Sequence, residues 1–123
     1  MATKSEIVQW FHDNFPSIET VDRGLVLDLA TKNGRSQKVY VEILDSIISL
    51  ESPFGDESNG PAGVILPAVS KLTKLGIGMT GKFYVLRHVI PTSNLDVSEI
   101  EFGIKTVAHD ADEIEFALGE DRF

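Results

Sequence analysis

One group of side chains has metal-ligand chemistry at helical spacing. His109, Asp112 and Glu113 stand at positions i, i+3 and i+4, which would place an imidazole and two carboxylates on one face of a helix. A metal site needs more ligands than one helix edge offers. Residues 110–112 begin like a calcium loop, but the glycine and the closing glutamate of such a loop are missing. A solvated acidic face explains the group better, so we expect no metal and no cofactor.

A second pattern has the glycine spacing of phosphate-binding loops. Residues 76–81 read Gly-Ile-Gly-Met-Thr-Gly. In a dinucleotide fold this motif follows a strand and opens a helix, so that the helix N-terminus meets the pyrophosphate. Here an expected helix precedes the motif and an expected strand follows it, so the geometry is reversed. We interpret the glycines as a helix stop followed by a tight turn.

Arg87 and His88 interrupt an otherwise apolar strand pattern. A buried arginine needs a carboxylate partner, and Asp28, Glu42 and Asp45 are the partners that we expect. The structural interpretation is an internal ion pair, or a buried stem whose charged head reaches water. General acid–base catalysis by His88 with Asp28 or Glu42 would require a pocket, for which the sequence gives no sign.

The composition excludes several classes of function. The chain has 123 residues, no cysteine and a formal net charge of −8. Disulfides, thiolate metal sites and cysteine nucleophiles are therefore excluded. We expect no binding to nucleic acid or membrane, because no cluster of Lys and Arg is present. A chain of this length is expected to form a single domain over residues 1–123. No signal peptide or membrane-spanning run is evident, so we expect the protein in the cytoplasm.

The strongest structural signal lies at the C-terminal end. Asp96 is a good N-cap for a helix that starts there. Residues 96–123 hold 9 of the 19 acidic residues and 2 of the 11 basic ones, so they carry −7 of the net charge of −8. Apolar residues at alternating steps of three and four predict one long helix with one apolar stripe. The stripe consists of Val97, Ile100, Ile104, Val107, Ala111, Ile114 and Leu118.

The first half of the chain predicts a helix and three strands. Residues 3–15 form the expected helix, since Thr3 and Glu6 have capping-box spacing and the apolar residues fall on one side. Residues 25–52 alternate apolar and polar positions, which predicts a three-stranded antiparallel meander. Asn33-Gly34 is a strong signal for its first hairpin.

The second half begins with residues 53–62, which are rich in glycine and proline and predict a connecting loop. Residues 61–75 predict a helix that stops at Gly76. Residues 82–90 are apolar on both alternating faces, which predicts a strand that is buried on both sides or lies in a subunit interface. The expected order is α-β-β-β-α-β-α, an α+β fold with a twisted antiparallel sheet packed by helices.

The C-terminal pattern is also familiar. The segment KFYVLRHVIPTSNLDVSEIEFGIKTVAHDADEIEFAL joins a strand ending at proline, a polar turn and a long acidic helix. Together with the α-β-β-β-α elements expected before this segment, the chain resembles the type III secretion chaperone-like fold, which includes class I secretion chaperones and YbjN-type bacterial domains. The resemblance implies a homodimer and apolar patches that hold an extended client segment. A usual extra strand of that fold would be missing here or reduced to residues 77–80.

We therefore expect a non-enzymatic, homodimeric, chaperone-like module that binds a client protein or peptide on its sheet and first helix. The resemblance matches four residues to the first chaperone helix, and we expect these to bind the client: Ile7, Trp10, Phe11 and Phe15. The last strand, the second helix and the final stripe are all candidates for the dimer interface. The expected contacts from the last strand are Tyr84, Leu86 and Val89.

Two other functions remain open. The chain could be a small α+β enzyme or ligand-binding domain with a pocket between sheet and helices, lined by His88, Arg87, Asp28 and Tyr40. A deep, closed pocket would favour that function, whereas a shallow groove with exposed apolar strips would favour protein binding. The third possibility is a structural subunit of a larger assembly.

Overall fold

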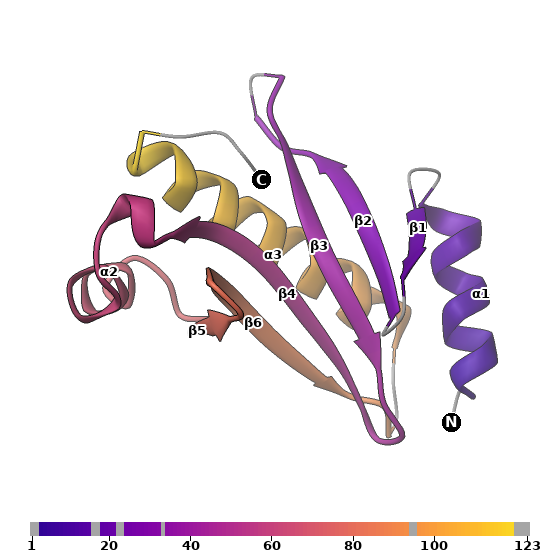
Figure 1. Ribbon diagram of the computed structural model, residues 1–123. Coiled ribbons are helices and arrows are strands. Elements are labelled where there is room, and N and C mark those ends of the chain that lie inside the picture. The colour runs from indigo at the N-terminus through magenta and orange to yellow at the C-terminus, as the bar shows by residue number, and fades with distance from the viewer. Residues whose placement is uncertain (1–2, 16–17, 22–23, 33, 94–95, 120–123) are drawn as a thin grey trace.

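The computed structural model describes residues 3–15, 18–21, 24–32, 34–93 and 96–119. It has the expected α+β fold with an antiparallel sheet, in the order α-β-β-β-β-α-β-β-α (Figure 1). The elements are α1 (Lys4–Asn14), β1 (Ile18–Val21), β2 (Gly24–Ala30), β3 (Ser36–Ile43), β4 (Ile47–Asp56), the 3-10 turn η1 (Glu57–Asn59), α2 (Ala62–Val69), β5 (Gly76–Thr80), β6 (Phe83–Pro91) and α3 (Val97–Ala117).

The six strands form one open sheet in the order β1-β2-β3-β4-β6-β5, and every neighbouring pair is antiparallel. The expected meander is confirmed as β2, β3 and β4. Gly34 has a φ of +79°, as a tight hairpin between β2 and β3 requires, while Asn33 lies outside the described residues. Strands β4 and β6 pair along most of their length, and β3 and β4 are the two central strands of the sheet.

The expected cap of the first helix is confirmed. The Glu6 backbone N–H donates to Thr3 Oγ1 at 3.2 Å, and the Thr3 backbone N–H donates to Glu6 Oε1 at 3.2 Å. Two of the free N–H groups at the start of α1 are satisfied in this way.

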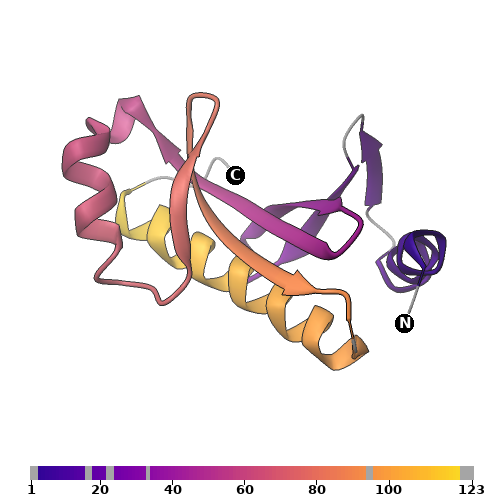
Figure 2. The same ribbon diagram turned by 90° about the horizontal axis from the view of Figure 1, so that it is seen from below.

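All three described α-helices contribute to the core on one face of the sheet. Ile7 and Phe11 of α1 join the core with Leu25 and Leu27 of β2. Helix α2 packs with the far end of α3 and with Phe54, Tyr84 and Leu86 of β4 and β6. The apolar stripe of α3 is confirmed from Ile100 to Ile114, with its two ends less buried. Figure 2 shows α3 crossing below the strands, so the sheet has one covered face and one open face.

Glycine allows α3 to approach the sheet closely. A Cβ atom added at Gly103 would lie 3.0 Å from Ile90 Cδ1, 3.1 Å from His88 Cδ2 and 3.2 Å from Leu50 Cδ1. Contacts this short would push the helix away from β4 and β6. Gly103 therefore sets the distance between the two layers.

Three expectations about the middle of the chain are wrong. Residues 53–56 continue β4 instead of forming a loop, and α2 ends at Val69 instead of reaching residue 75. Gly76 is not a helix stop but the first residue of β5, an edge strand. The structure also contains β1, which the sequence did not predict.

Candidate functional site

The open face of the sheet is the face opposite the helices. One row of paired residues crosses it from strand to strand: Val26 opposes Tyr40, Tyr40 opposes Glu51, and Glu51 opposes Arg87. Alternate side chains of a strand point to opposite faces. Residues two positions away from this row, such as Glu42 and Val89, therefore share the open face.

A hollow of about 510 Å³ lies on the open face. Its rim reaches from Val21 on β1 to Thr80 on β5, and the central strands supply the floor. In Figure 2 both edges of the sheet turn away from α3. The lining residues are Val21, Gly24, Leu25, Tyr40, Val41, Glu42, Ser49, Glu51, Pro53, Thr80, Phe83 and Arg87.

A polar cluster stands at one end of the hollow. Arg87 Nε donates to Glu51 Oε1 at 2.8 Å, and Arg87 Nη2 lies 2.7 Å from the same oxygen in an ion pair. Arg87 Nη2 donates to Thr80 Oγ1 at 3.3 Å, and Thr80 Oγ1 in turn donates to Glu51 Oε2 at 2.8 Å. The guanidinium also lies over Gly78, where an added Cβ would be 3.7 Å from Nη1. The ion pair that we expected for Arg87 is thus present, but its partner is not one of the three carboxylates named from the sequence.

Apolar side chains line the rest of the hollow. Tyr40 lies in the middle of the open face with 44% of its surface exposed, and Val21 on β1 is 39% exposed. Phe83 is half-buried on the β6 side. Exposed aromatic and aliphatic side chains around a shallow concave surface are typical of binding sites for other molecules.

The client-binding residues expected on the first helix are largely inside the protein. Ile7 and Phe11 are buried in the core, where they contact the strands. Trp10 and Phe15 are half-buried, and the Trp10 ring meets those of Phe11 and Phe15 edge-to-face at 5.1 and 5.8 Å. Within this chain, Trp10 and Phe15 retain side-chain surface that a partner could contact.

The three residues expected at the dimer interface lie on different faces of the sheet, and two of them are buried. Tyr84 and Leu86 are 0% exposed on the covered face, and Tyr84 Oη donates to the Gly60 carbonyl at 2.6 Å. Burial, with the charges of Glu57 and Asp56, raises the pKa of Tyr84. Val89 lies on the open face and is 44% exposed.

The alternative pocket around His88 is not assembled. His88 lies beside Gly103 on the covered face, whereas Arg87 belongs to the open face. Tyr40 and Arg87 do line one hollow, but Asp28 and His88 are not among its lining residues. The structure therefore separates the acid–base candidates that the sequence allowed.

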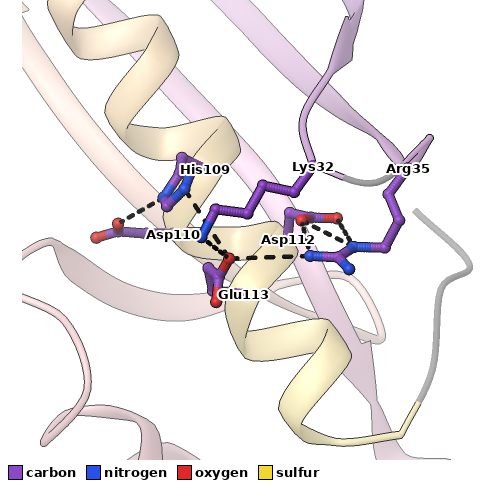
Figure 3. Close-up of polar contacts among 6 residues, drawn as sticks. All are labelled: Lys32, Arg35, His109, Asp110, Asp112 and Glu113. Atoms are coloured by element: carbon purple, nitrogen blue, oxygen red, sulfur yellow. Dashed lines mark hydrogen bonds and ion pairs between the residues drawn. The ribbon is translucent and has the colours of Figure 1, made fainter.

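The charged group on α3 is partly buried, so a wholly solvated acidic face was the wrong interpretation. Asp112 is 1% exposed and accepts two hydrogen bonds from Arg35 Nε, at 3.1 and 3.0 Å, and one from Nη2 at 2.8 Å (Figure 3). Arg35 also stacks on the ring of Phe116, with 4.4 Å between Cζ and the ring centroid. The cluster ties the β2–β3 hairpin to α3.

The outer part of this cluster is more exposed. Lys32 Nζ lies 3.0 Å from Glu113 Oε1, and His109 Nε2 lies 3.9 Å from the same oxygen. A hydrogen bond from Lys32 lowers the pKa of the Glu113 carboxyl, and nearby positive charge adds to the effect. Over the described part of the chain, no group of three or more His, Cys, Asp or Glu side chains is arranged to hold a metal ion.

Sequence reasoning missed most of the hollow. The sequence did not indicate four of its lining residues: Val21, Glu51, Thr80 and Phe83. The alternation of Tyr40 and Glu51 with buried neighbours was nevertheless a signal in the sequence for this face of the sheet.

Within the described ranges, no helix has the length and apolarity that crossing a membrane would require. No family model, curated protein or solved structure matches the chain.

Proposed function

We propose that the chain is a non-enzymatic, chaperone-like module that holds an apolar or extended segment of a client protein on its open face. One observation carries this proposal. The described α-helices all pack on one side of the sheet, and the other side presents a hollow with exposed apolar side chains at its centre and rim. Burial of such surface against a partner is favourable.

The shape and residue types of the hollow suit a peptide segment. Tyr40 offers a rigid aromatic side chain with a polar end, a residue type enriched among the dominant contacts of protein interfaces. The hollow is open rather than enclosed, so a chain segment can lie across it. Trp10 and Phe15 on the α1 side are half-buried and offer apolar surface apart from the hollow, next to the core of the covered face.

The proposed kinship with the type III secretion chaperone-like fold has one further support. The extra strand that such a fold needs between the second helix and the last strand is present as β5. The additional edge strand β1 was not expected for this fold. We extend the proposal to a homodimer, for which Val89 and the exposed Val64 of α2 offer apolar surface.

A second candidate function is the binding of a small ligand. The hollow of about 510 Å³ falls within the usual size range of small-molecule sites, and the Arg87–Glu51–Thr80 cluster could orient a polar group. A small molecule that saturates the hollow would compete with any client segment there.

The proposed function is tested by the binding of a permanently unfolded probe, fluorescently labelled reduced and carboxymethylated α-lactalbumin. Tyr40→Asp places a charge in the centre of the open face, so it should weaken binding by about fivefold or more. The matched control is Phe102→Asp on α3, where a 73% exposed ring faces away from the sheet. Absence of binding, or equal weakening by both variants, would contradict the proposal.

A further inference from the structure

The charges that line the hollow do not balance. Two carboxylates, Glu42 and Glu51, and one guanidinium, Arg87, are among the lining residues. Arg87 already forms an ion pair with Glu51, because both its Nε and its Nη2 lie less than 3 Å from Glu51 Oε1. Glu51 is further engaged by Thr80. Glu42 is therefore the lining charge that has no ion pair among the described residues, although Lys4 and His12 line an adjoining hollow with it.

Glu42 is held in place by the sheet. It stands on β3 opposite Ser49, an uncharged residue, and it is half-buried. Its strand neighbour on the same face is Tyr40, the exposed aromatic residue of the hollow. Among the described residues, no lysine, arginine or histidine lies within ion-pairing distance of its carboxylate. A partly desolvated carboxylate without a counter-ion favours a ligand that brings one.

We infer that the client segment is basic as well as apolar, with a lysine or arginine that pairs with Glu42. The apolar side chains of the segment lie against Tyr40 and Phe83. This inference rests on the proposed function, since it names the chemistry of the segment bound at the same hollow.

Electrostatics at longer range act in the same direction. The chain has a net charge of −8, which accelerates the approach of cationic segments and slows anionic ones. An acidic segment would meet Glu42 and Glu51 at close range, while Arg87 is already paired. Discrimination against acidic clients follows from this repulsion.

The test uses three labelled peptides with capped ends and the repeat Leu-Xaa-Thr, where Xaa is lysine, glutamine or glutamate. Binding is measured by fluorescence anisotropy with the full chain. The lysine peptide should bind about fivefold more tightly than the glutamine peptide, and the glutamate peptide should bind most weakly. Glu42→Gln should remove the preference for lysine, and Glu42→Lys should transfer it to the glutamate peptide.

The matched control is Glu101→Gln, which removes one exposed carboxylate on α3 and changes the net charge equally. It should leave the lysine preference intact. If Glu42→Gln leaves it intact as well, or if the two variants reduce it equally, the inference is overturned, because attraction would then come from the net charge alone.

Failure of the inference can be told apart from failure of the proposed function. Equal binding of all three peptides, weakened by Tyr40→Asp but not by Glu42→Gln, would retain a binding face and overturn the basic specificity. Absence of binding by every peptide overturns the inference, and the α-lactalbumin probe then decides whether the open face binds unfolded protein at all.

Discussion

Asp112 and Arg35 form a largely buried ion pair. The carboxylate is 1% exposed and the arginine side chain 12%, and the guanidinium contacts the carboxylate through both Nε and Nη2. The two residues are 77 positions apart in sequence. A buried pair of this kind adds little net stability compared with apolar residues, but the loss of one partner leaves a charge uncompensated.

Asp112→Asn should therefore lower the free energy of unfolding by about 3 kcal/mol, because the largely buried Arg35 would lose the carboxylate that both its Nε and its Nη2 contact. Urea unfolding followed by circular dichroism measures this loss. Glu113→Gln is the neighbouring control and should cost less, since Glu113 and Lys32 are both substantially exposed. A variant Asp112→Asn as stable as Glu113→Gln would mean that the ion pair is not formed in solution.

The sequence did not identify the ion-pair partners of Arg87 and Asp112, because these partners lie on distant parts of the chain. The sequence indicated that Arg87 needs a carboxylate, and this was correct. Glu51 was not considered, because its position opposite Arg87 depends on the register between β4 and β6. Asp112 was assigned to a solvated face for a related reason: nothing local to α3 reveals that Arg35 reaches it from the β2–β3 hairpin.

At the scale of elements, the start of α3 depends on a titratable cap. The Ser98 backbone N–H and then its hydroxyl donate to Asp96 Oδ1, at 2.9 and 3.0 Å, and these bonds lower the pKa of the Asp96 carboxyl. A depressed pKa in the folded state stabilises the fold above the unfolded-state pKa. That contribution is lost as the pH falls through the folded-state pKa.

The melting temperature of the wild type should therefore fall as the pH is lowered from about 5 to 3. Asp96→Asn keeps a good cap that does not titrate, so its melting temperature should fall less steeply over the same range. Differential scanning calorimetry in low-salt buffers measures both curves. Parallel curves would show that the cap does not contribute to the acid sensitivity.

The elements that the sequence failed to predict have identifiable causes. Strand β5 is rich in glycine, which disfavours strand formation in isolation, and it is stabilised by its pairing with β6 through a turn with Gly81 at a φ of +60°. Strand β4 continues through Pro53, which appeared to be a break. There the side chain of Gln37 donates to Ser52 Oγ at 2.9 Å and to the Pro53 carbonyl at 2.6 Å, linking β3 to β4 where their backbone pairing has ended.

At the scale of the whole molecule, the sequence predicted the fold class but not the layering. Alternation in residues 82–90 indicated burial on both faces of the strand, and the structure covers one face with helices. Val85 on the open face is nevertheless buried. An apolar strand pattern does not state which layer buries each face, so the hollow could not be predicted from periodicity.

The same layering changes how a homodimer should be tested. Leu86→Asp would place a charge in the core, because Leu86 is 0% exposed, and the resulting unfolding would say nothing about association. Val89 lies on the open face outside the lining of the hollow, so Val89→Asp can disrupt a two-fold contact there while leaving the client site free.

Light scattering across a dilution series should give the mass of a dimer for the wild type, and of a monomer for Val89→Asp, because a charge at the centre of an apolar contact is not compensated. Phe102→Asp is the control, since Phe102 is exposed on α3 and does not belong to its apolar stripe, and it should remain dimeric. A dimer that persists in Val89→Asp would move the interface to α2, where Val64→Asp becomes the deciding variant. A wild-type monomer at micromolar concentration would remove the homodimer from the proposal and leave the open face as the binding surface of a single chain.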